Sequence, residues 1–208
     1  MRVTTTREEM LRHLRKLGIR DERVLEVMSR VPREEFVPPE HRDVAYGDHA
    51  LPVGQGQTIS QPYVVARMTE LLTPGPTDRV LEVGTGSGYQ AAVLSLLARE
   101  VITVELRPDL ADAARERLRR LEYANVRVVN ADASLGHPDE APYDRIIVTA
   151  AAPYIDPALE AQLARDGRLV VPVGPRDMQE LVVRYADGRE ERHGAVAFVP
   201  LRGEAGFR

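Results

Sequence analysis

Three glycines that directly follow an apolar segment are the residues in this sequence most suited to chemistry. Gly84, Gly86 and Gly88 are spaced G-x-G-x-G. The apolar segment 80–83 before them reads as a buried strand, and a helical pattern begins at Tyr89. Glycine suits such a turn because it adopts backbone dihedrals that a Cβ forbids and lets a ligand lie directly on the main chain. The loop therefore predicts a binding site for a nucleotide-like cofactor.

Two carboxylates beside this loop bear on the identity of the cofactor. Glu82 precedes the first glycine, where a negative charge opposes a pyrophosphate and favours a cationic amine. Glu105 ends the next apolar segment, where it can accept hydrogen bonds from ribose hydroxyls. S-adenosylmethionine carries an ammonium, a sulfonium and an adenosine, so it suits the loop better than NAD. A glycine-rich turn without a ligand is the simpler alternative, and the strand, the helix and Glu105 all count against it.

The composition limits the size and the class of the protein. The 208 residues allow one substantial α/β domain. We expect a single domain over residues 1–208, in which residues 1–61 form N-terminal helices and an active-site loop and residues 62–208 form the cofactor-binding core. The net charge of -4 at pH 7 argues against a protein built mainly to bind nucleic acid.

Metal binding, export and membrane insertion are not expected either. Cysteine is absent and the five histidines are scattered without ligand spacing, which predicts no metal site. The sequence starts with polar residues and nowhere contains about 18 consecutive apolar residues. We therefore expect a cytoplasmic monomer that binds neither nucleic acid nor membrane.

The elements that must position the glycine loop begin with an N-terminal appendage. Residues 7–17 and 21–30 show the spacing of two short amphipathic helices, and Pro32 ends the second. The segment 36–39 contains too many prolines for the interior of a helix, so we predict that the chain runs extended as far as Tyr46.

A loop rich in glycine and glutamine follows the appendage. Residues 49–60 predict a hairpin or an irregular loop with polar, uncharged side chains. A helix then starts near Pro62 and stops at Pro74. From the pattern alone, Ser60 reads most simply as the N-cap of that helix.

Strands and helices alternate after the glycine loop. Right-handed crossovers then predict a doubly wound, mostly parallel sheet with helices on both faces and ligands at the carboxyl ends of the strands. Segments 181–185 and 195–199 flank an Asp187-Gly188 turn, which predicts a closing antiparallel pair. The expected strands are 101–105, 126–130, 143–149 and 168–173, and the expected helices are 89–98, 108–121 and one from about 157, capped by Asp156.

Asp132 follows the predicted strand 126–130 at the ligand-binding edge. A carboxylate at this place can accept a hydrogen bond from an adenine amino group. A turn residue that caps its own loop is an equally simple interpretation.

Several motifs are more specific than the glycine loop. They are Tyr46, Asp48, residues 51–52, the stretch 54–62, residues 83–89, residues 147–151 and the FVPL segment 198–201. The stretch 54–62 ends in the sequence GQTISQP, at residues 56–62. Together they resemble the protein-L-isoaspartate O-methyltransferase family, in particular its bacterial members, over about residues 7–203. Many methyltransferases share the glycine loop, whereas nothing in their general fold requires GQTISQP. The resemblance implies a Rossmann-like S-adenosylmethionine-dependent methyltransferase fold.

The family implies a repair reaction. A methyl group would pass from S-adenosylmethionine, leaving S-adenosylhomocysteine, to the α-carboxylate of an L-isoaspartyl residue in a damaged protein or peptide. The methyl ester primes a succinimide, whose hydrolysis returns some normal aspartate. A carboxylate with a reference pKa of about 4 is already a nucleophile at neutral pH, so no general base is needed. Alignment of the two partners then carries the catalysis, and it can lower a barrier by roughly 7 to 11 kcal/mol.

The resemblance also implies roles for individual residues. The catalytic residue would be Ser60, with its hydroxyl near the acceptor carboxylate. The substrate-binding residues would be Thr58, Ile59, Ser60, Val199, Pro200 and Leu201, the last three through backbone hydrogen bonds. The cofactor-binding residues would be Glu82, Gly84, Thr85, Gly86, Ser87, Gly88, Glu105, Leu106, Asp132, Ala133 and Thr149.

Three other functions fit parts of the sequence. A methyltransferase of the same fold that acts on RNA or a small molecule is disfavoured by the acidic composition and the lack of an aromatic-and-basic stripe. A non-catalytic adaptor that binds S-adenosylmethionine is disfavoured by Ser60 together with an intact glycine loop. A nucleotide-dependent oxidoreductase would be favoured by tight binding of NAD in preference to S-adenosylmethionine.

Overall fold

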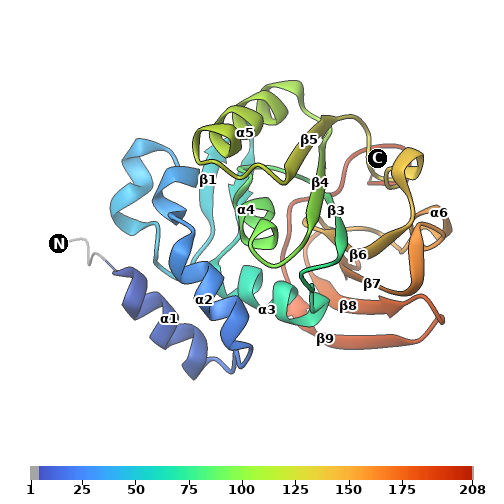
Figure 1. Cartoon of the computed structure of the whole chain (residues 1–208), viewed down its shortest axis with the longest axis horizontal. Coiled ribbons are helices and arrows are strands. Elements are labelled where there is room, and N and C mark those ends of the chain that lie inside the picture. The colour runs from blue at the N-terminus through green and yellow to red at the C-terminus, as the bar shows by residue number, and fades with distance from the viewer. Residues whose placement is uncertain (1–4, 208) are drawn as a thin grey trace.

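A seven-stranded sheet forms the centre of the molecule in a computed structural model that describes residues 5–207 (Figure 1). Its order is β5-β4-β3-β6-β7-β8-β9, with parallel pairing from β5 to β7 and antiparallel pairing from β7 to β9. The strands are β3 (Arg79–Val83), β4 (Glu100–Glu105), β5 (Val126–Asn130), β6 (Tyr143–Val148), β7 (Leu163–Val173), β8 (Gln179–Tyr185) and β9 (Glu190–Val196). The predicted mostly parallel sheet with antiparallel C-terminal strands is confirmed.

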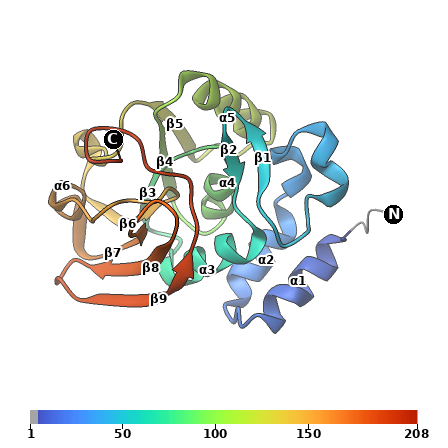
Figure 2. The same ribbon diagram turned by 180° about the vertical axis from the view of Figure 1, so that it is seen from behind.

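The longer helices lie on one face of this sheet. Figures 1 and 2 show α1 and α2 at one side of the molecule, the β8–β9 pair at the other side, and α3 between them, with α4 against the sheet. A small hairpin of β1 (Leu51–Gly54) and β2 (Gln57–Ile59) lies beside them. The α-helices are α1 (Arg7–Lys16), α2 (Glu22–Arg30), α3 (Pro62–Leu72), α4 (Tyr89–Ser95), α5 (Pro108–Arg120) and α6 (Pro157–Glu160).

Alternation along the strands builds two hydrophobic cores. Val80 and Val101 pack with the side chains of α1 to α5, whereas their neighbours Leu81 and Ile102 belong to a cluster on the opposite face. That second face is covered by shorter segments, among them α6, which contributes Leu159. The first core joins the N-terminal helices to the sheet, and the expected division of the chain stays a prediction.

The order in which the chain adds strands to the sheet reverses at β3. The chain moves outward through β4 and β5, and then returns to the other side of β3 as β6. Gly84 N donates to Val104 O at 2.9 Å, and Thr149 N donates to Val83 O at 2.9 Å, just beyond the paired strands. A crevice at the carboxyl ends of strands is the usual ligand site where strand order reverses in this way. The glycine loop lies at this point.

One predicted segment is wrong. The stretch from Phe36 to Tyr46 is extended only around Val37, between two 3-10 helices, η1 (Arg33–Phe36) and η2 (Pro39–Val44). Proline disfavours helix interiors but suits the first helical position, where its missing N–H needs no partner. Pro39 occupies such a position, so η2 begins inside the proline-rich segment.

Three other boundaries also differ from expectation. The partner of β8 is residues 190–196 and not 195–199, because Gly188 N donates to Tyr185 O at 2.9 Å and pairing resumes immediately with Arg184 opposite Glu190. The helix from Pro157 is a single turn, since β7 begins at Leu163 to pair with β6. The helix after the glycine loop ends at Ser95 and not at residue 98.

Candidate active site

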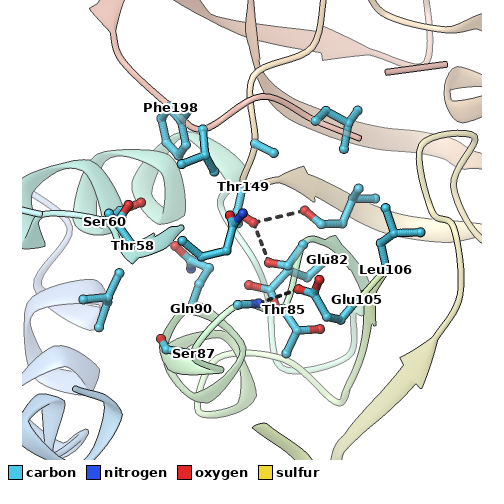
Figure 3. A pocket seen from close by; sticks show the side chains of 18 of the residues that line it. Thr58, Ser60, Glu82, Thr85, Ser87, Gln90, Glu105, Leu106, Thr149 and Phe198 are labelled. Atoms are coloured by element: carbon cyan, nitrogen blue, oxygen red, sulfur yellow. Dashed lines mark hydrogen bonds between the residues drawn. The ribbon is translucent and has the colours of Figure 1, made fainter. Parts of the chain in front are cut away.

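A pocket of ≈ 380 Å³ opens beside the carboxyl ends of β3, β4 and β6 (Figure 3). It brings the glycine loop together with the β1–β2 hairpin, the N-terminal parts of α3 and α4, and the C-terminal residues 198–202. The predicted cofactor residues that line it are Glu82, Gly84, Thr85, Gly86, Ser87, Glu105, Leu106, Ala133 and Thr149, and the predicted substrate residues are Thr58, Ile59, Ser60, Val199, Pro200 and Leu201. Gly88 and Asp132 do not line it.

Close contacts hold the glycine loop in its place. Gly84 has a φ of 96°, and a Cβ at this position would lie 2.6 Å from the hydroxyl oxygen of Thr149. That hydroxyl donates to Gly84 O at 2.5 Å, so Thr149 braces the loop from β6. Thr85 forms a buried hydroxyl pair with Thr103 at 2.7 Å. These contacts with Thr149 and Thr103 hold the loop on the side away from the pocket, and its main chain faces the pocket.

Glu82 is a buried carboxylate without a partner. Its side chain is fully buried, and within residues 5–207 neither of its oxygens accepts a hydrogen bond. Burial raises the pKa of Glu82 to about 8 and the nearby negative charge of Glu105 adds to the rise, whereas the hydroxyl of Thr103 opposes it. Unpaired buried oxygens are costly unless a donor from a ligand satisfies them. Because Glu82 also lines the pocket, it fits an ammonium group of a bound molecule.

Glu105 connects the glycine loop to the start of α5. One carboxylate oxygen accepts from Gly86 N at 2.9 Å and the other accepts from Arg107 N at 3.0 Å. Carboxylate oxygens have spare lone pairs, so both remain able to accept a ribose hydroxyl. The guanidinium of Arg107 in turn donates twice to Gln55 at the tip of the β1–β2 hairpin, to its backbone oxygen and to its Oε1, both at 2.7 Å. This latch between Arg107 and Gln55 ties the hairpin to the cofactor side of the pocket.

Ser60 is not the N-cap of α3. The cap position is Gln61, whose side chain makes no capping bond, and the carboxylate of Asp48 accepts from Tyr63 N at 2.8 Å instead. Within the described part of the chain, the hydroxyl of Ser60 makes no hydrogen bond, and it faces the pocket together with Thr58 (Figure 3). The hydroxyl is therefore available to a substrate.

A buried arginine holds the backbone of Ser60. Arg33 is fully buried, and its guanidinium donates to Ala45 O and to Ser60 O, both at 2.7 Å. The guanidinium also lies over the ring of Tyr89 at 4.8 Å from its centroid, at the first residue of α4. Burial lowers the pKa of Arg33 below the ordinary arginine value. Sequence reasoning missed this residue, and an arginine beside two glutamates gives no sign that it is buried.

We expect Arg33→Lys to lower the free energy of unfolding by about 1 to 3 kcal/mol, because one ammonium cannot reach both carbonyls and leaves one unpaired. Urea unfolding followed by circular dichroism measures this change. Arg30→Lys is the matched control, since Arg30 is an exposed arginine at the end of α2. Equal stability of the two variants would contradict the role given to Arg33.

Asp132 has the geometry of a loop cap. One carboxylate oxygen accepts from Ser134 N at 2.8 Å and the other accepts from Glu204 N at 2.9 Å. Burial opposes ionisation, but these backbone N–H groups outweigh it and lower the pKa of Asp132. Gly203 packs so closely that a Cβ there would collide with the carboxylate of Asp132. Asp132 thus fastens the C-terminal turn onto the loop after β5, and its contact with adenine stays a prediction.

We expect Asp132→Ala to speed hydrogen exchange at the amides of Ser134 and Glu204 by about tenfold or more, since each loses its acceptor. Hydrogen exchange measured by NMR tests this prediction. The control is Asp139→Ala, because Asp139 is an exposed aspartate in η3 (Pro138–Glu140). Unchanged exchange would remove the capping role. Affinity for adenosine, measured on the same variant, tests the adenine contact separately.

The C-terminal segment at the pocket is held by an isolated parallel bridge between Ala151 and Pro200. Ala151 N donates to Val199 O at 2.8 Å, and Leu201 N donates to Ala151 O at 2.7 Å. Pro200 has no N–H, but Val199 N donates to no protein acceptor within residues 5–207, so this segment can offer that N–H together with its unpaired carbonyl groups to a substrate. The substrate contacts of Val199, Pro200 and Leu201 stay a prediction.

Sequence reasoning also missed several pocket residues. The spacing of Val64, Val65 and Met68 predicts only the apolar face of α3, and Phe198 stands out only as part of a motif. Gln90 was missed altogether, although it is a polar residue in a helix whose other residues are almost all apolar. Such a residue close behind a glycine loop is a signal that could have identified it.

Neither a metal centre nor a membrane span is evident in the described residues. No group of three or more His, Cys, Asp or Glu side chains there is arranged to hold a metal ion. Among residues 5–207, every helix is too short or too polar to cross a membrane.

Comparison with known proteins decides the family. The family described as protein-L-isoaspartate(D-aspartate) O-methyltransferase (PCMT) matches residues 5–206 of the sequence. The chain belongs to the PCMT family. The PCMT family also contains curated proteins at high identity to this chain, so the resemblance predicted from the motifs is confirmed.

Two relatives and two solved structures illustrate the PCMT match. The protein-L-isoaspartate O-methyltransferase of Methanoculleus marisnigri is 54% identical over 97% of this chain and 94% of its own length. That of Methanopyrus kandleri is 54% identical over 97% of this chain and 93% of its own. A structure named protein-L-isoaspartate O-methyltransferase superposes with a TM-score of 0.85 at 28% identity, covering 97% of this chain and 67% of the other. A Plasmodium falciparum PCMT structure in complex with S-adenosyl-L-homocysteine gives 0.82 at 24% identity, covering 94% of this chain and 98% of the other, and supports the fold.

Proposed function

We propose that this protein transfers a methyl group from S-adenosylmethionine to the α-carboxylate of L-isoaspartyl residues in damaged proteins and peptides. The methyl ester would prime a succinimide and so return part of the damage to normal aspartate. Membership of the PCMT family supports this reaction over RNA methylation and over NAD chemistry. The name of the Plasmodium relative, solved with S-adenosyl-L-homocysteine, supports the choice of cofactor.

One structural observation carries the proposal. The pocket presents a buried, unpaired carboxylate at one place, Glu82, and a hydroxyl without a protein partner at another, Ser60, among residues 5–207. The first suits the ammonium of a sulfonium cofactor, and the second suits an anionic acceptor group. A nucleotide cofactor with a pyrophosphate would offer no hydrogen-bond donor to the oxygens of Glu82 and would oppose the ionisation of this side chain.

The residues of this chain would perform binding and alignment. When bound, S-adenosylmethionine supplies an electrophilic methyl group and keeps the bonding electron pair on its sulfur as S-adenosylhomocysteine. Glu105 and the glycine loop would hold the ribose and the amino-acid end, which fixes where the methyl group lies. Ser60 would donate a hydrogen bond to the acceptor carboxylate and aim its free oxygen, from a loop that Arg33 holds in place. No proton must move in this reaction, which agrees with a pocket lined by neither His nor Cys in residues 5–207.

The test uses two synthetic peptides that differ only in an L-isoaspartyl or a normal aspartyl linkage, with S-adenosylmethionine labelled in the methyl group. Base-labile label on the isoaspartyl peptide alone is the expected result. Label on neither peptide, with S-adenosylmethionine still bound, would overturn the reaction and favour the non-catalytic adaptor. Label on RNA, or tight binding of NAD in place of S-adenosylmethionine, would favour the other two alternatives.

Our proposal for the oligomeric state, the location and the partners of the protein is based on the sequence. A cytoplasmic monomer that works without nucleic acid or membrane is the setting that we propose, and the net charge of -4 supports it. Sedimentation and cell fractionation would test the monomer and the location.

A further inference from the structure

Gln90 is a pocket residue to which no role has been given. It lies in the first turn of α4, is 8% exposed and lines the pocket. In the view of Figure 3 its side chain rises from α4 into the space between Ser60 and Thr149. A buried amide in this position must either be satisfied by the protein or bind what enters the pocket.

The hydrogen bonds of Thr69 fix which way the amide faces. The hydroxyl of Thr69, on α3, donates its single hydrogen to Val65 O at 2.8 Å. The same hydroxyl oxygen is 2.9 Å from Nε2 of Gln90, so it can only act as the acceptor there. The NH₂ group of Gln90 therefore points to α3. Its Oε1 accepts no hydrogen bond within residues 5–207 and faces the pocket.

Gln90 and Glu82 lie on the same side of the sheet. Alternation along β3 puts Glu82 on the face of Val80, whose core contains the α4 residues Ala91 and Val93. The pocket therefore offers two kinds of acceptor from this side. The carboxyl oxygens of Glu82 on β3 are unsatisfied within residues 5–207, and the only hydrogen bond of the Gln90 amide there is the one from Nε2 to Thr69. A ligand group with several N–H donors and a positive charge is their natural complement.

We propose that Oε1 of Gln90 accepts a hydrogen bond from the amino-acid ammonium of S-adenosylmethionine, while Glu82 balances its charge. This rests on the cofactor named under the proposed function. Gln90 then selects cofactors that carry the amino group, and Thr69 is a positioning residue that keeps the amide from turning over.

The test measures affinity by titration calorimetry without peptide, using three ligands. S-adenosylmethionine has both the amino and the carboxylate group, decarboxylated S-adenosylmethionine keeps only the amino group, and 5′-methylthioadenosine has neither. Gln90→Met is expected to weaken the two amine-bearing ligands by about 10- to 100-fold, as for loss of a hydrogen bond to a charged group, and to leave methylthioadenosine within about twofold. Thr69→Val is expected to give the same pattern with smaller losses, because it frees the amide without removing it.

Each other outcome overturns the proposal. Equal losses for all three ligands would mean that Gln90 only packs the pocket. A loss for S-adenosylmethionine without one for its decarboxylated form would place the amide on the carboxylate. If the unaltered protein bound methylthioadenosine and neither amine-bearing ligand, the ammonium site itself would be refuted. Failure of the unaltered protein to bind any of the three would refute the proposed cofactor, which is a distinguishable result.

Discussion

Ser60→Ala is expected to lower kcat for an isoaspartyl peptide by about 10²-fold while leaving the Kd for S-adenosylmethionine within about twofold. The hydroxyl is held at the pocket by the bond from Arg33 to the backbone of the same residue, and no protein group within residues 5–207 competes for it. Its loss would leave the acceptor carboxylate bound but badly aimed, and alignment is the main contribution that the protein can make here.

Steady-state kinetics with the isoaspartyl peptide, together with calorimetry of the cofactor, separates the two effects. Ser60→Thr is the matched control, because it keeps the hydroxyl, and it should recover most of the lost kcat. If Ser60→Ala weakened cofactor binding as much as turnover, the hydroxyl would belong to the cofactor site and not to the acceptor site.

Glu82→Gln is expected to weaken S-adenosylmethionine by about 10- to 100-fold, since a buried ammonium would lose its counter-charge. The same change should also abolish a release of protons that we expect when the cofactor binds to the unaltered protein. The raised pKa of about 8 means that Glu82 is mostly protonated in the pocket at neutral pH. Pairing with an ammonium requires the ionised form, so binding at about pH 6.5 should release about one proton.

Calorimetry in buffers of different ionisation enthalpy measures that proton directly. The free energy of unfolding of the ligand-free protein offers a second measurement. Because the folded pKa lies above the usual value of 4.5, the folded state binds more protons than the unfolded state between about pH 4.5 and 8. Stability should therefore fall as pH rises through this window, and Glu82→Gln should remove that part of the slope. Proton release that persisted in the variant would assign it to another group.

The cofactor half of the fold was predictable because its signals are local. The apolar segment, the glycines and the carboxylate Glu105 specify a strand, a turn and a second strand end without help from distant residues. The predicted strand 126–130 coincides with β5, and the predicted start of a helix at Pro62 coincides with α3. Proline and glycine mark these boundaries through the dihedral angles that they allow.

The positions of the residues around Ser60 were not predictable, because they depend on contacts between segments that are separate in the sequence. Asp48, which precedes Tyr63 by 15 residues, caps α3, so the cap expected of Ser60 was wrong even though the helix was right. Arg33 is buried because two carbonyls and the ring of Tyr89 happen to surround it. The direction of the Gln90 amide follows from one hydroxyl on a different helix. Such features come from packing and could not be found by reading the sequence in windows.

The latch between Arg107 and Gln55 joins the loop after β4 to the hairpin that carries Thr58. Gln55 at the tip of the hairpin closes the cofactor side, and the same short hairpin leads directly into Thr58 and Ser60 on the acceptor side. If an exchange of spent cofactor parts Gln55 from Arg107, Thr58 and Ser60, which we propose to bind the acceptor, would move with the hairpin. A methylated chain would then be let go before the next cofactor is loaded, so repair of several damaged sites on one chain would be distributive, with a fresh encounter for each site.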